Sequence, residues 1–279
     1  MYILKTGLIN NNNSNCYRQY SNCVTFKQFA NANTVLKKQS FELAQKYLRC
    51  FAKEIFEYRA EGEKILQPYD IPFKKLQVIA QKELTQMMKF PTDKKLFIVT
   101  GRIGGGKSTF VEQNKLNEIF YTPDSDEIKP FLPGYKKMGA GYVHKASWSI
   151  NSVNLSEALK RGIDTIVQTA TTIDNLDDII DEARDYGYQD IVMIHIDTNE
   201  ENAIKRASAR ASVTGRFVDP NEIRNRRYID IIVPTYKTPL RGLSQLIVYN
   251  NNGKSPVKVE DINLQSQPEN LTYVTESDD

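Results

Sequence analysis

The chain has 279 residues, of which 40% are hydrophobic and 25% charged, a composition typical of a soluble globular protein. Thirty-seven Lys and Arg residues against 34 Asp and Glu residues leave a net charge of +3, which argues against nucleic acid or an anionic membrane as the partner. The sequence has neither the roughly 18 consecutive apolar residues of a membrane span nor a signal peptide, so we expect an intracellular, cytoplasmic protein.

The N-terminal part of the sequence predicts two segments. Residues 1–34 are rich in Asn and lack apolar periodicity, so we expect them to be disordered or loosely attached. Residues 35–90 are expected to form a helical region. Its first long helix carries apolar residues three and four positions apart, and a second helix is expected over 73–88.

Residues 91–250 alternate between strand-like and helix-like runs. The expected strands are short and rich in β-branched or aromatic residues: 95–100, 119–122, 164–168, 190–196 and 243–249. The runs between them have helical periodicity: 107–115, 143–161, 173–186, 200–212 and 220–238. This alternation predicts a parallel sheet covered by helices on both faces. Residues 251–279 are polar and acidic, and we expect a flexible tail there.

A phosphate-binding motif, G-x-x-x-x-G-K-[ST], follows the first expected strand and opens a helix. It comprises Gly101, Arg102, Ile103, Gly104, Gly105, Gly106, Lys107, Ser108 and Thr109. Glycines allow the backbone N–H groups to turn toward an anion, and the helix N-terminus adds a partial positive charge. Lys107 is expected to reach the β- and γ-phosphates, and the Ser108 hydroxyl to ligate Mg²⁺.

The motif and the alternation together predict an α/β fold of the P-loop NTPase type. We expect a three-layer sandwich with a central parallel sheet of about five strands, preceded by the helical N-terminal region.

A group of carboxylates follows the second expected strand. Asp126 is our candidate for the catalytic base, because a carboxylate at the carboxyl end of a strand beside a P-loop can accept the proton of an acceptor hydroxyl. It also becomes a candidate substrate contact. The alternative is that Ser125 or Asp126 caps a short helix that begins at Glu127.

Three arginines in the segment before residue 217 are candidates for stabilising the charge of a transferred phosphoryl group. Arg206 and Arg210 are four residues apart and so share one helix face, and Arg216 follows Gly215. Guanidinium groups match the oxygens of a loose phosphoryl-transfer transition state. The alternative is a solvated basic face.

These residues also carry a resemblance. Residues 96–249 resemble the zeta toxin family of P-loop kinases and, more distantly, polynucleotide kinases. The matching features are the P-loop, D-x-D-E-I-K at 124–129 followed by L-P-G-Y at 132–135, A-L-K-R-G at 158–162, and the A-I-x-R…R…T-G-R-F-V stretch that ends at Val218.

The resemblance implies ATP and Mg²⁺ as cofactors and Asp126 as the base. It also implies that Lys107, Arg206 and Arg216 lie around the phosphates. The best-known activity of the family, phosphorylation of UDP-N-acetylglucosamine, makes a UDP-sugar the leading acceptor, whereas nothing in the sequence indicates an antitoxin-like partner.

The sequence departs from the family in the region expected to contact the acceptor. Gln168 stands where the family has an acid, and no acid occurs between 147 and 155. Thr169 and Thr171, which follow Gln168 closely, and His144, near the start of a helix, are further candidate substrate contacts. For His144 the alternative is capping or packing. Trp148, on that same helix, is expected to pack in the core.

Three functional hypotheses follow. The first is a kinase that transfers the γ-phosphate of ATP to a hydroxyl of a small metabolite, with a nucleotide sugar as the leading acceptor. The second is a polynucleotide kinase that acts on nucleic-acid ends. The third is an ATP-binding interaction module with weak catalysis, in which the helical N-terminal region binds a protein partner.

Overall fold

The computed structural model describes residues 26–60, 69–214, 217–226, 229–237 and 241–265. Residues 1–25 of the segment predicted to be disordered and residues 266–279 of the predicted tail therefore lie outside the described residues, as does Arg216. Within the described part of the chain, no helix combines the length and the apolar character needed to cross a membrane.

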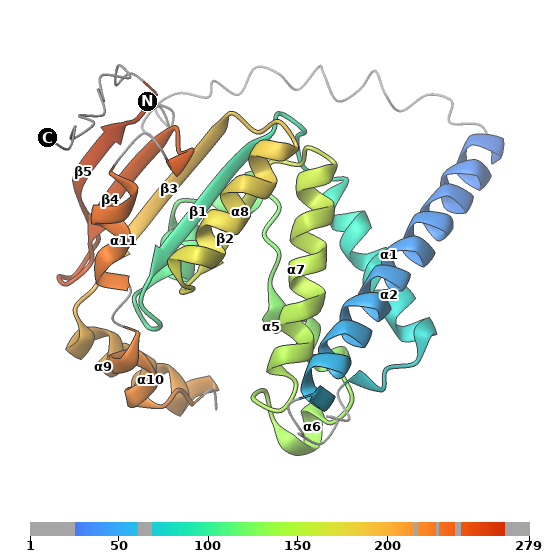
Figure 1. Ribbon diagram of the computed structural model, residues 1–279, viewed down its shortest axis with the longest axis horizontal. Coiled ribbons are helices and arrows are strands. Elements are labelled where there is room, and N and C mark those ends of the chain that lie inside the picture. The colour runs from blue at the N-terminus through green and yellow to red at the C-terminus, as the bar shows by residue number, and fades with distance from the viewer. Residues whose placement is uncertain (1–25, 61–68, 215–216, 227–228, 238–240, 266–279) are drawn as a thin grey trace, which may run out of the picture.

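A five-stranded sheet forms the centre of the protein, with the order β2-β1-β3-β4-β5 (Figure 1). Its strands are β1 (Lys95–Gly101), β2 (Thr165–Thr169), β3 (Asp190–Asp197), β4 (Gln245–Asn250) and β5 (Val257–Asn263). The first four are parallel, and β5 pairs antiparallel with β4 at the edge. The predicted α/β class with a central sheet of about five strands is confirmed, and the sheet is parallel except for β5.

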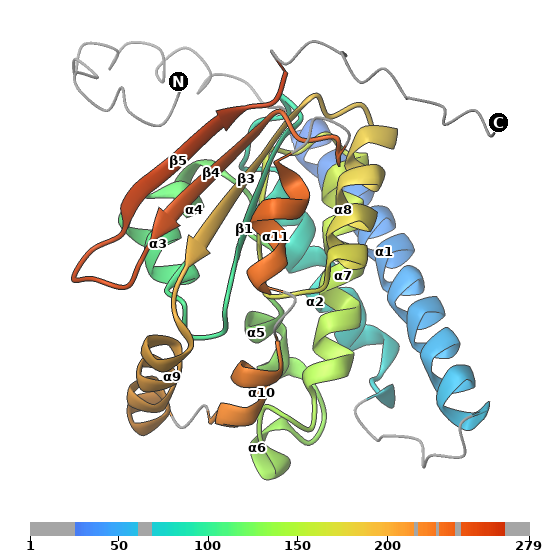
Figure 2. The same ribbon diagram turned by 60° about the vertical axis from the view of Figure 1, so that its left-hand side comes forward.

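Helices cover both faces of the sheet, because alternate side chains of each strand point to opposite faces (Figures 1 and 2). Leu96 and Ile98 pack against α7 (His144–Lys160), α8 (Ile173–Asp185) and α11 (Ile229–Tyr236). Their neighbours in β1, Phe97 and Val99, pack against α3 (Lys107–Gln113) and α4 (Leu116–Ile119). Four further short elements are α5 (Ser125–Ile128), the 3₁₀ turn η2 (Lys129–Phe131), α6 (Tyr135–Met138) and α10 (Pro220–Asn225). A longer helix, α9 (Glu200–Thr214), follows β3.

Two predicted boundaries within the domain are wrong. The strand expected over 119–122 is reduced to one bridge between Tyr121 and Thr165, and Pro123, which lacks an N–H group, follows directly. The helix expected over 220–238 is two helices, α10 and α11, because α10 ends at Asn225 and Arg226 leaves the helical region with ψ of 50°.

Two predictions about the ends of the domain are also wrong for part of their range. The first helix, α1 (Phe26–Ala60), begins inside the segment predicted to be disordered. Strand β5 lies inside the predicted tail. As an edge strand, β5 has one pairing partner and a mostly exposed surface, which explains why its sequence is as polar as that of a tail.

The N-terminal helices α1 and α2 (Phe73–Met87) share one apolar core with α5 and α7. Two tyrosines anchor this packing. The Tyr47 hydroxyl of α1 donates a hydrogen bond to Asn154 Oδ1 of α7, and the Tyr121 hydroxyl donates to Glu83 Oε2 of α2 at 2.7 Å. Burial raises the pKa of the Glu83 carboxyl. The helical region is therefore built into the same folded unit as the sheet and the helices that cover it.

Candidate functional site

The phosphate-binding loop connects the carboxyl end of β1 to the first turn of α3, as the motif predicts. Gly104 and Gly106 have φ angles of +78° and +93°, in the left-handed region that favours glycine. A Cβ on Gly104 would lie 2.3 Å from the Ala203 carbonyl oxygen of α9, and one on Gly106 would lie 2.6 Å from Asn251 Nδ2. Because a side chain would collide at both positions, the loop requires glycine there.

Lys107 is held against the backbone of its own loop. Its Nζ donates to the carbonyl oxygens of Gly101 and Arg102, at 2.8 and 2.9 Å. Burial, together with the positive charges of Arg226 and Arg210, lowers the pKa of the Lys107 ammonium to about 7. An anion placed in the loop would therefore compensate for both the desolvation and the repulsion.

The carbonyl oxygen of Gly105 is fixed from the neighbouring strands. It accepts hydrogen bonds from Asn251 Nδ2 at 2.8 Å and Thr198 Oγ1 at 3.0 Å, residues that directly follow β4 and β3. Arg206 Nη2 donates to the carbonyl oxygen of Asn251 at 2.8 Å. Asn251 thus connects the loop to α9, although the sequence analysis placed it in the flexible tail. The signal that could have found it is its position after a parallel strand, since all such carboxyl ends meet at one edge.

Replacing Asn251 with Ala is expected to weaken nucleotide binding by about tenfold, or about 1.4 kcal/mol, because the loop loses one of its two side-chain tethers. Titration with a fluorescent nucleotide analogue measures this change. Asn263→Ala is the matched control, since its Oδ1 accepts a bond from the Gln265 backbone N–H in an exposed turn. Equal affinity in the two variants would contradict the tethering role of Asn251.

A cavity of about 360 Å³ opens between the loop and α9. The residues that line it come from the predicted site: Gly104, Gly106, Lys107, Ser108, Thr109, Arg206 and Arg210. The glycine cradle and the three cationic side chains fit a polyphosphate. No group of three or more His, Cys, Asp or Glu residues that could hold a metal occurs in the described part of the chain. Ser108 with phosphate oxygens and water is a donor set that Mg²⁺ accepts.

Two residues of the phosphate-binding motif, Arg102 and Ile103, direct their side chains to helices outside the loop. Arg102 is buried and forms an ion pair with Asp230 of α11. The side chain of Ile103 packs against Ala203, Ala207 and Ile223. Neither residue is among those that line the cavity, so each could contribute to phosphate binding only through its backbone.

Asp126 lies in the first turn of α5, at the same edge of the sheet. The cap of this helix is Asp124, whose Oδ1 accepts from the Asp126 backbone N–H at 2.8 Å. The capping alternative for Ser125 and Asp126 is therefore wrong. The Asp126 carboxylate instead accepts a hydrogen bond at 2.7 Å from Nζ of Lys129, whose side chain is buried. A carboxylate that accepts a hydrogen bond from a buried ammonium is fixed in position.

The remaining predicted substrate contacts are Thr169, Thr171 and His144. Thr169 ends β2, and the Thr171 hydroxyl accepts from Asn175 Nδ2 of α8 at 2.8 Å. His144 is exposed at the start of α7. None of these three lines the cavity between the P-loop and α9. The prediction that Trp148 packs in the core is wrong, because 51% of its surface is exposed.

Arg226 is a further cationic residue near the loop, and it is not among the arginines predicted to stabilise the phosphoryl group. Its Nη1 donates to the carbonyl oxygen of Ala170 at 2.6 Å, just after β2. Among the nearby cations, Arg226 has the largest effect in lowering the pKa of Lys107. The positive charge around the loop therefore comes from two helices, α9 and the end of α10. No local pattern marks Arg226, since its neighbours Arg224 and Arg227 give the same signal.

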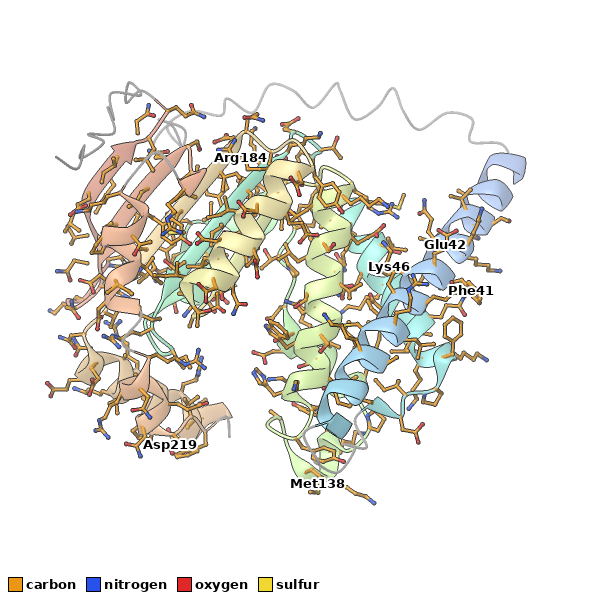
Figure 3. All side chains as sticks on the ribbon, in the orientation of Figure 1. Phe41, Glu42, Lys46, Met138, Arg184 and Asp219 are labelled. Atoms are coloured by element: carbon orange, nitrogen blue, oxygen red, sulfur yellow. The ribbon has the colours of Figure 1, made fainter. Side chains whose placement is uncertain are left out.

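Two walls stand on either side of this edge (Figure 3). Asp219 lies at the tip of the wall formed by α9 and α10, and Met138 lies at the tip of the wall formed by α5, α6 and α7. Of the cationic residues that line the cavity, Arg206 and Arg210 belong to the first wall and Lys107 to the P-loop, whereas Asp126 belongs to the second wall. This arrangement separates the phosphate-binding side from the carboxylate side.

Among solved structures, that of the PezAT chromosomal toxin–antitoxin system of Streptococcus pneumoniae is similar, with 15% sequence identity and a TM-score of 0.51. The match covers 67% of this chain and 79% of that chain. The AvrRxo1-ORF1:-ORF2 complex with ATP matches at 14% identity and a TM-score of 0.49, covering 68% of each chain. No curated protein matches the sequence.

The comparison with protein families identifies the family of the chain. The family model for the zeta toxin matches residues 80–257, from within α2 to the start of β5, which is well over half of the chain. This range contains the P-loop, Asp126, the arginines of α9 and Asn251. The chain therefore belongs to the zeta toxin family, and its fold is that of a zeta toxin-like kinase.

Proposed function

We propose that this protein is an ATP- and Mg²⁺-dependent kinase that transfers the γ-phosphate of ATP to a hydroxyl of a small metabolite. A nucleotide sugar such as UDP-N-acetylglucosamine is the leading acceptor. The observation that carries the proposal is the cavity in which Lys107, Arg206 and Arg210 surround a glycine cradle, beside a carboxylate fixed on the opposite wall. Membership of the zeta toxin family supports the same reaction class.

In this proposal the P-loop and α9 bind the phosphate chain. The loop N–H groups and the N-terminus of α3 hold the β- and γ-phosphates, and Ser108 is the protein ligand for Mg²⁺. Bound Mg²⁺ neutralises charge on the phosphate oxygens. Lys107, Arg206 and Arg210 stabilise the charge that spreads over the equatorial oxygens during transfer.

Asp126 serves as the base on the opposite wall. The acceptor hydroxyl oxygen forms a bond to the γ-phosphorus, the bond from the γ-phosphorus to the bridging oxygen breaks, and ADP leaves with that electron pair. The hydroxyl proton passes to the Asp126 carboxylate. Lys129 holds this carboxylate in place through the bond to Oδ1.

The test is ATP consumption by the purified protein with Mg²⁺ across UDP-sugars, nucleosides and 5′-hydroxyl oligonucleotides, with Lys107→Ala as the blank. Turnover on a UDP-sugar supports the proposal. Preferential turnover on oligonucleotides that weakens steeply with salt would identify a polynucleotide kinase instead. ATP binding without transfer to any acceptor would identify an interaction module.

Binding of ATP·Mg²⁺ at pH 8 is expected to take up about one proton per site. The pKa of Lys107 at about 7 leaves its amine mostly neutral at pH 8 in the free protein, and adjacent phosphates favour the charged form. Calorimetry in two buffers with different ionisation enthalpies measures the uptake. Lys107→Ala should abolish it, and equal uptake in both proteins would assign the proton to another group.

A protein that inhibits the kinase is part of this proposal. The family and the similar structure from a toxin–antitoxin system support it. Growth arrest of bacterial cells that express the wild-type chain, but not Lys107→Ala, would show a toxic activity that needs such an inhibitor. Equal growth of the two cultures would contradict it.

A further inference from the structure

Trp148 is the single tryptophan of the chain, and 51% of its surface is exposed. It lies on α7 about two turns before Leu155 and three turns before Leu159, and these leucines pack against the sheet core. Residues spaced seven and eleven positions apart share a helix face. Trp148 and His144 therefore face the same direction as the two leucines, but nearer the N-terminus of the helix.

The N-terminal half of α7 extends beyond the carboxyl edge of the sheet (Figures 1 and 2). This follows from the topology, since α7 leads back to the start of β2, which is parallel to β1. The leucines lie over the strands, whereas Trp148 lies beyond them, at the edge where β1 delivers the P-loop. The exposed indole therefore belongs to the edge that carries the proposed active site.

The strand order decides which side of the P-loop Trp148 occupies. Strand β1 lies between β2 and β3, and α9, with its cavity-lining arginines, follows β3. Helix α7 precedes β2 and packs with α5, since Ile128 of α5 shares a core with Ala146 and Ile150 of α7. Trp148 is thus on the same wall as Asp126, which is the acceptor side, and opposite the arginines.

The side chains on this face of α7 favour a ligand that contains a flat aromatic ring. No carboxylate occurs from 144 to 155, so this part of the helix lacks the acidic acceptors that bind the hydroxyls of a sugar. It presents instead a large exposed aromatic surface, on which any base can stack. An exposed indole at a substrate edge contributes most when such a ring covers it.

We infer that Trp148 is a specificity-determining residue that stacks on the nucleobase of the phosphoryl acceptor, so that the acceptor is a nucleoside-containing metabolite. The inference rests on the proposed kinase function and deepens it. The sugar portion of a nucleotide sugar contributes less to affinity than its base, and nucleotides lacking the sugar still bind to this wall.

Trp148 fluorescence tests the inference without any need for turnover, because no other tryptophan contributes. The protein is first saturated with a non-hydrolysable ATP analogue and Mg²⁺, then titrated with UDP, UMP, AMP or N-acetylglucosamine 1-phosphate. We expect saturable quenching by at least one of the three nucleotides and none by the sugar phosphate. Quenching by the sugar phosphate alone, by the ATP analogue alone, or by none of the compounds would overturn the inference.

Kinetics of Trp148→Ala and Trp148→Phe provide the second test. Loss of stacking is expected to raise KM for the nucleotide acceptor about 10- to 100-fold, with KM for ATP unchanged, and Phe should restore most of the affinity. Met88→Ala, which shortens another exposed apolar side chain at the end of α2, is the matched control. A uniform fall in kcat in both variants at Trp148, with KM unchanged, would contradict the inference.

The two tests separate the inference from the function on which it rests. Base-dependent quenching together with no transfer to any acceptor would leave Trp148 as a nucleotide contact and refute the kinase. Transfer to an acceptor that lacks a base, without quenching by nucleotides, would retain the kinase and refute the role of Trp148.

Discussion

Asp126→Asn is expected to reduce the rate of phosphoryl transfer by about 10²- to 10⁴-fold while ATP affinity changes less than about twofold. The substitution removes the proton acceptor but keeps an oxygen that can accept the bond from Lys129. The residues proposed to bind ATP belong to the P-loop and α9 rather than to α5, so the substitution does not disturb them. Single-turnover kinetics with saturating acceptor measure the transfer step, and equilibrium titration measures ATP affinity.

Glu127→Gln is the matched control for this prediction. Glu127 is the next carboxylate on α5, and its side chain is exposed and pairs with Lys82 at 2.9 Å. This variant should retain transfer within about twofold of the wild-type rate, since exposed ion pairs contribute little. If the two variants lost transfer equally, the charge of α5 as a whole would be responsible, and Asp126 would not be the base.

Lys107→Ala is expected to lower transfer by about 10³-fold or more, because no other side chain places a mobile positive charge within the loop itself. The fold should be retained. In the ligand-free protein Lys107 is desolvated and repelled by Arg226 and Arg210, so its ammonium does not stabilise the folded state. Thermal unfolding should therefore show a midpoint equal to or above that of the wild type.

Lys205→Ala provides the comparison on α9. Lys205 is exposed and adjacent to Arg206 in sequence, but it does not line the cavity. It should retain transfer close to the wild-type rate. A large loss in Lys205→Ala would mean that the overall positive potential of the wall, rather than the placement of Lys107, supports the reaction.

Most of the fold could be predicted because its signals are local. The apolar runs of β1, β3 and β4 are buried on both faces, so each is continuous in sequence, and the helices between them keep their periodicity. The wrong strand predictions concern segments that pair with a neighbouring strand on one side only or through a single bridge. Strand β5 pairs only with β4, and the expected strand at 119–122 makes a single bridge.

The residues of the candidate site also fall into two groups, those that local sequence patterns predict and those that they do not. The P-loop and the arginines of α9 could be predicted because fixed spacing creates their geometry. Asn251 and Thr198 could not, since they reach the loop through hydrogen bonds from the ends of other strands. Arg226 could not either, since its charge acts on Lys107 from the end of α10. The exposure of Trp148 also depends on how far α7 extends past the sheet, which its amino-acid pattern does not reveal.

The shared core of the N-terminal helices bears on where this protein can be shortened. The family match begins at residue 80, in the middle of α2, yet Tyr47 of α1, which precedes the match, donates a hydrogen bond to Asn154 of the matched domain. A recombinant chain that starts at residue 80 or 91 would expose the apolar surface of α7 and leave the Asn154 amide without Tyr47. We expect such a fragment to aggregate. The segment that the family model matches is therefore shorter than the segment that the protein needs in order to fold.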